Sequence, residues 1–154
     1  MSSEMRTVGM GFYWQDLKVG DRYKSIGRTI TETDLMNFVT LTGMTEVLFT
    51  NREFLEKTSV IKGRVVPGVL VYAYSEGLLI PTMQGTGLAF LEAEFKVKGP
   101  TFVGDTIHVE VEVLEVRPTS KGNRAIVRTM NTVVKQTGET VITYNPLRML
   151  KRRD

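Results

Sequence analysis

Residues 42–68 read TGMTEVLFTNREFLEKTSVIKGRVVPG and lead directly into the apolar run VLVYAYSEGLL at 69–79. Pro67 and Gly68 are predicted to open a helix, because a proline in the first turn lacks an N–H that would have no partner there anyway. The run after them is apolar on nearly every side, which predicts a buried helix. Its small residues Ala73 and Gly77, four positions apart, are expected to let a sheet approach closely.

Shorter elements are predicted before this helix. Residues 22–30 are expected to form a strand. Thr31 is a candidate N-cap, with Asp34 three residues later as its capping-box partner, and Gly43 is well placed to end the helix that follows. Residues 51–58 are predicted to form a second short helix. The stretch at 42–68 therefore joins a capped helix to a buried one.

After Gly87 the sequence changes from a helical period to an alternation of apolar and polar residues. Alternation interrupted by turn residues is typical of antiparallel strands with one exposed face. A buried helix followed by such strands predicts an α+β domain, in which an antiparallel sheet wraps around one long central helix. The expected strands cover residues 91–97, 107–113, 125–135 and 140–150, with turns at 118–123 and 136–139.

The composition indicates a single domain spanning residues 1–154, a usual domain size. The absence of cysteine excludes disulfides, thiolate nucleophiles and cysteine-bound metals. The beginning of the chain does not resemble a signal peptide, and residues 65–83 are too polar and broken to span a membrane. We therefore expect a cytoplasmic protein that binds neither membranes nor nucleic acid. The basic residues 151–153 are expected to form a solvated end, although the net charge of +3 would suit a nucleotide phosphate.

Few side chains outside residues 42–68 are candidates for chemistry. His108, the only histidine, shares the predicted solvent face of its strand with Glu110. Without a second histidine or a cysteine, a transition-metal site is not expected. GlyMetGly at 9–11 and GlyThrGly at 85–87 lack the glycine spacing of a phosphate-binding loop. The sequence thus predicts no metal and no bound cofactor.

The order of features at 42–68 resembles the MaoC-like or (R)-specific enoyl-CoA hydratases. These features are a capped helix, a TGxxE-type turn, a short helix, and a loop ending GxVVPG before an apolar helix. The resemblance implies a hot-dog fold. In that family the turn carries an Asp and, after four intervening residues, a His. This dyad activates water for addition to an enoyl thioester, and a later His-Gly helps to bind the thioester carbonyl.

Alignment on Thr42-Gly43 shows which residues replace the family's catalytic types. The Asp position falls on Met44 and the His position on Phe49, while an intervening Asn falls on Glu46 and an Asp beyond the His on Asn51. Water addition needs a base for the water and an acid for the α-carbon. Met44 and Phe49 can be neither, so they are expected to line the substrate-binding site as apolar walls, beside Asn51.

The family's later His-Gly becomes Pro67-Gly68, and both residues are predicted to bind substrate. The Gly68 N–H at a helix start is a natural donor to a thioester carbonyl, or it simply belongs to a well-formed helix start. Glu46 is the carboxylate that remains on the turn and is the candidate catalytic residue. In an apolar pocket its pKa would rise, as a general base requires; alternatively it caps or pairs locally.

The resemblance implies three functions. The first is a MaoC-like protein that binds acyl thioesters of coenzyme A or acyl carrier protein and lacks the standard dyad. The second is an active enoyl-CoA hydratase or acyl-CoA thioesterase that uses Glu46. The third is a non-catalytic structural subunit of a hot-dog hetero-oligomer. Because hot-dog sheets pair edge to edge, a homodimer or a hetero-oligomer with another hot-dog protein is expected.

Overall fold

A computed structural model describes residue 5 and residues 7–154 of the chain. The predicted lack of a signal peptide falls partly on residues 1–4 and 6, which lie outside the described residues. In chain order the elements are η1 (Trp14–Asp16), β1 (Arg22–Lys24), β2 (Arg28–Thr29), α1 (Glu32–Thr42), α2 (Val47–Thr50), α3 (Arg52–Lys57), α4 (Gly68–Leu78), α5 (Ile80–Met83), β3 (Gly87–Glu92), β4 (Phe95–Val97), β5 (Thr106–Pro118), β6 (Arg124–Lys135), β7 (Thr140–Tyr144) and β8 (Leu147–Lys151).

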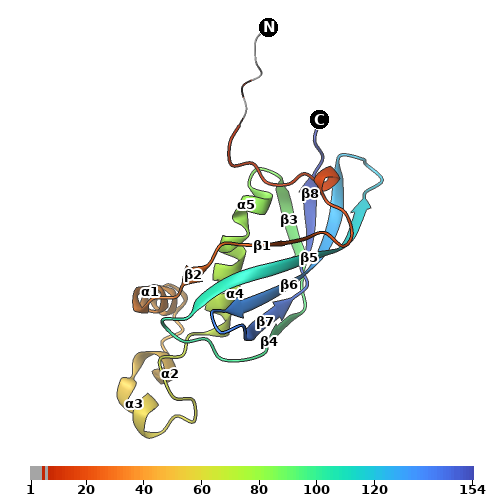
Figure 1. The fold of residues 1–154 in the computed structure, drawn as a ribbon. Helices are drawn as coiled ribbons and strands as arrows, with labels where there is room; N and C mark the ends of the chain where they lie inside the picture. Colours follow the sequence, from red (N-terminus) through yellow and green to blue (C-terminus); the bar gives the residue numbers. More distant parts are fainter. Residues whose placement is uncertain (1–4, 6) are drawn as a thin grey trace.

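The strands form one antiparallel sheet (Figure 1). β5 and β6 are its long central hairpin, in register from Ile107 opposite Lys135 to Pro118 opposite Ala125. β7 and β8 both pair with β6, and β4 and β3 follow them at one edge. β1 and β2 pair with β5 at the other edge. The predicted α+β class and the long antiparallel strands are therefore confirmed.

Three predicted strands are interrupted. The expected strand at 91–97 is divided between the end of β3 and β4, with residues 93–94 in neither. The expected strand at 22–30 is split into β1 and β2, and the expected strand at 140–150 is split into β7 and β8. In the strand at 140–150, Pro146 lies at the break, where it has no N–H to offer a neighbouring strand. β7 and β8 nevertheless continue along the same neighbour, β6, so the sheet keeps its order across the interruption.

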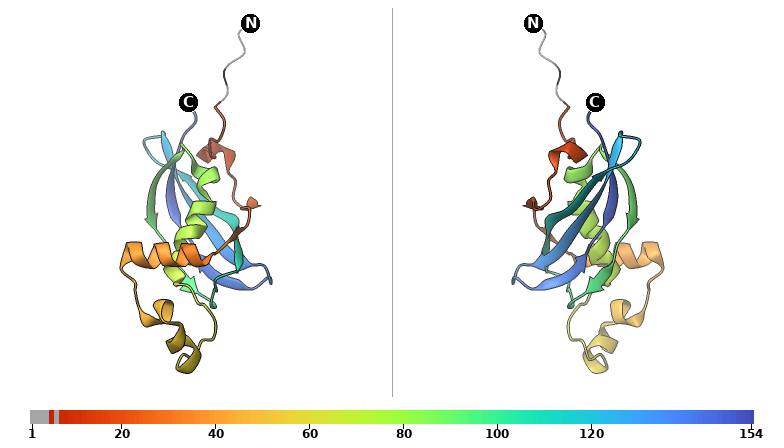
Figure 2. Two further views of the ribbon diagram at one scale, coloured as in Figure 1. Left: turned by 90° about the vertical axis from the view of Figure 1, so that its left-hand side faces the viewer. Right: turned by 90° about the vertical axis from the view of Figure 1, so that its right-hand side faces the viewer.

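Helix α4 lies along one face of the curved sheet (Figure 2). Its side chains Leu70 and Val71 are at most 1% exposed and belong to one core cluster with residues of β5 and β7, such as Val109 and Ile142. Ser75 on the same face is fully buried and donates its hydroxyl to the Val71 carbonyl at 2.7 Å. This apolar contact is the main packing between the helix and the sheet.

A charged contact fixes the same helix to the sheet. Glu76 of α4 accepts hydrogen bonds from Arg148 of β8 and from the Tyr144 hydroxyl of β7, the latter at 2.7 Å. The Arg148 side chain is only 13% exposed, so Glu76 is its principal charge partner inside the protein. Burial, reinforced by the nearby Glu76 carboxylate, raises the pKa of Tyr144 far above its ordinary value, which keeps its hydroxyl a donor.

Helix α1 begins and ends as predicted. The Thr31 hydroxyl accepts from the Asp34 N–H at 3.1 Å, and the Asp34 carboxylate accepts from the Thr31 N–H at 2.9 Å. Gly43 ends the helix with a φ of 74°, a conformation that favours glycine. Although burial opposes its ionisation, hydrogen bonds from Thr31 together with Arg28 and Tyr74 hold the pKa of Asp34 below its ordinary value. Asp34 thus ties α1 to β2 and α4.

One prediction about α4 is wrong for the single chain. The helix is not buried all round: Val69 is 46% exposed, and Ala73 and Gly77 lie exposed on the same side. Ile80, at the start of the following helix α5, is also 46% exposed. A Cβ added at Gly77 would meet nothing within 4 Å, so these small residues do not face the sheet. In the expected half-buried strand at 91–97, every residue except the half-buried Ala93 is also exposed. The reason is that the sheet covers only one face of α4 and leaves the other open.

Replacing Glu76 with alanine should destabilise the fold. The substitution leaves the poorly exposed Arg148 without its carboxylate, so the free energy of unfolding should fall by about 3 kcal/mol. Urea denaturation followed by circular dichroism measures this loss. The matched control is Glu115→Ala, which breaks an exposed pair with Arg117 and should cost less than about 1 kcal/mol. Equal losses in the two variants would contradict the assigned role of Glu76.

Candidate functional site

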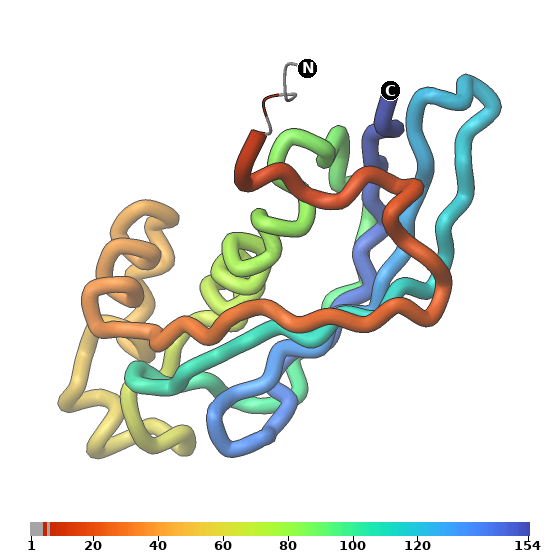
Figure 3. Tube along the Cα trace, turned by 45° about the horizontal axis from the view of Figure 1, so that its top comes forward, coloured from red at the N-terminus to blue at the C-terminus, as the bar shows by residue number. Residues whose placement is uncertain are grey.

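Residues 42–68 project beyond the sheet, at the end of the molecule opposite to both termini (Figure 3). Arg64 attaches this segment to α1. Its Nε and Nη2 donate to the Glu32 carboxylate at 2.7–3.1 Å, and its Nη1 donates to the Phe49 carbonyl. The hydrogen bonds from Arg64 lower the pKa of Glu32, although burial acts in the opposite direction. A single arginine therefore connects α1, α2 and the loop before α4.

The two residues at the dyad positions lie in the hydrophobic core. Phe49 is 7% exposed and is part of the main core cluster, against which the half-buried Met44 packs. Neither side chain carries a group that can transfer a proton. At these two positions the turn contributes packing between α2 and the body of the protein.

Two polar residues of residues 42–68, Asn51 and Glu46, lie at the starts of short helices. The Asn51 side-chain oxygen accepts from the Phe54 N–H at 3.0 Å and so caps α3. Glu46 stands at the N-cap of α2, with an exposed side chain that makes no capping hydrogen bond. The Glu46 carboxylate therefore makes no hydrogen bond to the first turn of α2, whereas the Asn51 side chain already has a structural partner in α3.

An apolar hollow of about 330 Å³ lies between the start of α4 and strands β4 and β7. Gly68 forms part of its wall, where an added Cβ would come within 3.1 Å of Val97 Cγ2. In the first turn of α4 the Leu70 N–H donates to the Pro67 carbonyl at 3.0 Å, so the N–H groups that are left without an acceptor in the helix are those of Gly68 and Val69, at the positive end of the helix dipole. The residues that line this hollow are Ile61, Val65, Val66, Gly68, Val71, Val97, Gly99, Pro100, Thr101 and Ile142.

The structure separates most of the predicted site residues from this hollow. Gly68 lines it, whereas Glu46, Asn51 and the buried Pro67 do not, and neither do Met44 and Phe49. A second hollow, of about 680 Å³, lies beside α3 and has a mixed lining of both charge signs: Glu32, Arg52, Leu55, Glu56, Lys62, Gly63, Arg64 and Val103. Within the described part of the chain, the candidate base Glu46 therefore does not line the hollow in which the candidate carbonyl donor Gly68 lies.

Other sequence candidates lie apart from these hollows. His108 is half-buried in β5, with Nε2 4.0 Å from Glu110 Oε1. Within the described part of the chain, no group of three or more His, Asp or Glu side chains is placed to hold a metal ion. Across residue 5 and residues 7–154, no helix has the length and apolar character needed to cross a membrane.

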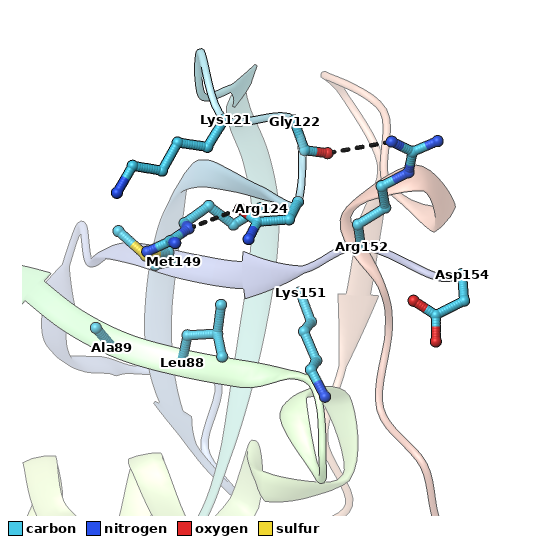
Figure 4. A pocket seen from close by; sticks show the side chains of 10 residues that line it. Leu88, Ala89, Lys121, Gly122, Arg124, Met149, Lys151, Arg152 and Asp154 are labelled. Carbon is cyan, nitrogen blue, oxygen red and sulfur yellow. Dashed lines mark hydrogen bonds between the residues drawn. The ribbon is translucent and has the colours of Figure 1, made fainter.

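Sequence reasoning missed a basic hollow of about 730 Å³ at the opposite end of the molecule (Figure 4). Residues 151–153 are all exposed, as expected of a solvated end. Within this end Lys151 belongs to β8, and the Arg153 guanidinium binds Asp16 at 2.6–2.7 Å. Arg124 is the register partner of Lys151 across β6 and β8. The signal that could have revealed the hollow is the placement of basic residues at the tip of one predicted hairpin and at the end of the last strand.

Comparisons with known proteins agree with this architecture. The family model for the MaoC like domain matches residues 16–137. An (R)-specific enoyl-CoA hydratase from Rhodospirillum rubrum is 29% identical over 109 residues, which are 71% of this chain and 74% of that protein. The crystal structure of a MaoC-like dehydratase from the same organism is similar with a TM-score of 0.81 and 25% identity, over 94% of this chain and 99% of that one.

A protein from Mycobacterium tuberculosis with a double hotdog fold is also similar. It has a TM-score of 0.84 and 20% identity, and the match covers 96% of this chain and 46% of that one. These likenesses confirm the hot-dog fold predicted from the sequence.

Replacing Phe49 with alanine should show that this position now serves the core. We expect the free energy of unfolding to fall by about 3–5 kcal/mol, as is usual when a buried Phe is truncated. Thermal and urea denaturation measure the change. Val47→Ala in the same helix is the control, because Val47 is 45% exposed and its truncation should cost less than about 1 kcal/mol. A Phe49 variant as stable as the Val47 variant would refute the structural role.

Proposed function

Because this chain belongs to the MaoC-like domain family of hot-dog hydratases and dehydratases, we propose that it binds acyl thioesters without the usual catalytic dyad. The thioester is one of coenzyme A or of acyl carrier protein. The observation that carries the proposal is Gly68, which sits at the start of α4 and in the wall of an almost wholly apolar hollow. We also take residues 1–154 as one domain and expect it in the cytoplasm.

The hollow at Gly68 suits the two parts of such a ligand. Its apolar lining matches a short acyl chain, whose burial is favourable in proportion to the apolar area removed from water. The thioester carbonyl oxygen can accept the Gly68 N–H, where the helix dipole favours partial negative charge. No side chain is required for this interaction, so it persists when the family's catalytic side chains are replaced.

The dyad positions argue for binding without ordinary hydration. Adding water to an enoyl thioester requires a base and an acid within hydrogen-bond reach of the reacting atoms. Phe49 is 7% exposed in the core and Met44 packs against that core, so neither position supplies such a group. Pro67 and Asn51 are proposed to shape the approach to the hollow rather than to transfer protons.

One observation favours a second candidate function. Glu46 is an exposed carboxylate that is not used in capping α2, and it lies on the turn where the family has its dyad. A movement of this turn could aim Glu46 and a water at a bound thioester. This is the hydratase or thioesterase alternative, and the third alternative is a non-catalytic subunit of a hot-dog hetero-oligomer.

We further propose that the chain pairs with a second hot-dog domain along the β3–β4 edge. That edge, the open face of α4 and the start of α5 carry seven exposed large apolar side chains: Val69, Ile80, Leu88, Phe90, Leu91, Phe95 and Val97. The opposite edge carries Arg22, Lys24 and Arg28, and charges of this kind discourage pairing between strands. A long apolar edge is a template for another strand, and the M. tuberculosis protein holds two hot-dog units in one chain.

Binding and turnover can be separated with a short enoyl-CoA such as crotonyl-CoA. We expect the melting temperature to rise, because a ligand specific for the native state stabilises it, while the absorbance of the conjugated thioester stays constant. The matched variant Glu46→Gln should behave like the wild type in both measurements. Turnover that is lost in Glu46→Gln would establish the enzymatic alternative. No thermal shift with any acyl thioester would leave the structural-subunit alternative.

Sedimentation velocity tests the proposed pairing. The double variant Val69→Glu, Leu91→Glu places two carboxylates on the apolar surface and should shift the protein from dimer to monomer, raising the dimer dissociation constant by at least about tenfold. The control Val8→Glu, Val19→Glu makes the same charge change at two other exposed valines and should remain dimeric. If the wild-type protein is monomeric on its own, it does not form a homodimer along this edge, and the paired domain must come from a different hot-dog protein.

A further inference from the structure

We propose that the hollow beside α3 binds a short apolar peptide with free termini, whose carboxylate meets Arg52 and whose ammonium group meets Glu56. The hollow has a volume of about 680 Å³, within the range of about 300–1,000 Å³ that is usual for small-molecule sites. None of its lining residues also lines the hollow at Gly68. Peptide binding beside α3 therefore does not require thioester binding at Gly68.

One face of α3 forms a wall of this hollow. Arg52, Leu55 and Glu56 lie at positions i, i+3 and i+4 of the helix, so they share one face, and all three line the hollow. Leu55 is 5% exposed, whereas Arg52 and Glu56 are exposed. The wall thus carries a cation and a carboxylate one helical turn apart, with an apolar side chain on the same face.

The two charges on this wall are not paired with other charges of the protein. Ten ion pairs within 4.0 Å are formed in residue 5 and residues 7–154, and neither Arg52 nor Glu56 belongs to any of them. Their order in the helix, with the cation four residues before the anion, is also the less favourable one for a pair within a helix. Both groups can therefore meet a ligand without giving up an internal ion pair.

The other charged residues of the hollow already have partners. Arg64 binds the Glu32 carboxylate, with Nη2 2.7 Å from Oε1, and Lys62 Nζ donates to the Glu56 carbonyl at 3.3 Å. The hydrogen bond from Arg64 lowers the pKa of Glu32, and the nearby charge of Arg52 acts in the same direction. Glu32 is therefore ionised and neutralised within the protein, which leaves Arg52 as the free cation and Glu56 as the free carboxylate.

The remaining lining suits an apolar ligand body. Leu55 faces the half-buried Val103 across the α3 hollow, and Gly63 lies between them in the lining as backbone alone. Gly63 has a φ of 102°, and a Cβ added there would lie 3.2 Å from Cδ1 of the Phe102 ring. Apolar side chains of a ligand are favoured here because their burial removes apolar surface from water. The hollow thus matches a molecule with an apolar body and one charge of each sign.

The spacing of the two charges indicates the length of the ligand. Residues four apart on a helix have Cβ atoms about 5–6 Å apart. Two extended residues span up to about 7 Å, so the termini of a dipeptide can reach both positions. The two charged groups of a single amino acid are attached to one carbon atom and match this spacing less well. A guanidinium binds a carboxylate through two parallel hydrogen bonds, which places the peptide carboxylate at Arg52 and its ammonium group at Glu56.

Isothermal titration with leucyl-leucine and two analogues tests this site. N-acetyl-leucyl-leucine lacks the ammonium group, and leucyl-leucinamide lacks the carboxylate. The wild-type protein should bind leucyl-leucine, and each analogue should bind about tenfold more weakly or worse, because each loses one charge-assisted contact. An acetylated peptide that binds as tightly as leucyl-leucine would overturn the proposal, since the hollow would then be a plain carboxylate site. A wild-type protein that binds none of the three would overturn it as well.

Single variants assign each charge to its partner. Arg52→Gln should raise the Kd for leucyl-leucine by about tenfold and leave the Kd for leucyl-leucinamide unchanged within about twofold. Glu56→Gln should have the same effect on leucyl-leucine and leave the Kd for the acetylated peptide unchanged. A variant that weakens all three ligands equally would contradict the assigned pairing, because the lost side chain would then act through the shape of α3.

The same helix supplies matched controls. Glu53 and Lys57 form an exposed pair with each other and do not line the hollow. Lys57→Gln removes the same charge as Arg52→Gln, and Glu53→Gln the same charge as Glu56→Gln, so both controls should bind leucyl-leucine with the wild-type Kd. Equal losses in the controls would show that only the net charge of α3 matters and would overturn the site.

Hydrogen exchange locates the bound peptide. The hollow is walled by α3, by residues 62–64 and by Val103. Saturating leucyl-leucine should therefore slow amide exchange in residues 52–64 by about threefold or more, because it restrains local opening of this segment. Exchange at the hairpin tip, residues 118–123, should not change. Protection that spares residues 52–64 would overturn the assignment. The thermal shift with crotonyl-CoA is measured separately, so the proposed function stands or fails independently of these results.

Discussion

The contact between helix α4 and the sheet is the constraint on which the rest of the structure depends. Leu70 and Val71 enter the core, and Glu76 binds Arg148 and Tyr144 on two neighbouring strands. The apolar contacts supply the driving force but are not directional, whereas a partly buried carboxylate must keep its donors. Together they fix both the face and the position of α4, and so the place where Gly68 meets the sheet.

The same contact explains what the single chain leaves open. A sheet can cover only one side of a helix. The face of α4 that carries Val69 therefore stays exposed, as do Ile80 at the start of α5 and the edge strand β3. Burial within one chain therefore does not account for the apolar residues around the whole helix, and the proposed pairing with a second hot-dog domain would cover the open face. The sequence pattern was interpreted as burial by the helix's own sheet, which is why Ala73 and Gly77 were assigned to the wrong side.

Local signals made most of the fold predictable from the sequence. The capping box of Thr31 and Asp34, the start of α4 at Gly68 and the β5–β6 hairpin depend on neighbours in sequence or on alternation. The Glu76–Arg148 contact and the basic hollow could not be predicted in this way, because each joins segments that only the sheet order brings together. The candidate site could be predicted from the sequence only in part. The start of a helix at Gly68 is a local signal, whereas the hollow around Gly68 depends on tertiary packing.

The surroundings of the dyad positions explain why apolar side chains suit them. Phe49 points into the core beneath α2, and its carbonyl is held by Arg64, so this turn is fixed by packing and by one charged contact. A polar group at position 49 would need partners that the apolar surroundings do not offer. By contrast, the N–H of Gly68 belongs to the backbone of α4 and persists as long as the helix does. A fold that keeps the helix therefore keeps the Gly68 N–H and the apolar hollow beside it, and this is the basis on which we propose thioester binding for a chain without the family's dyad residues.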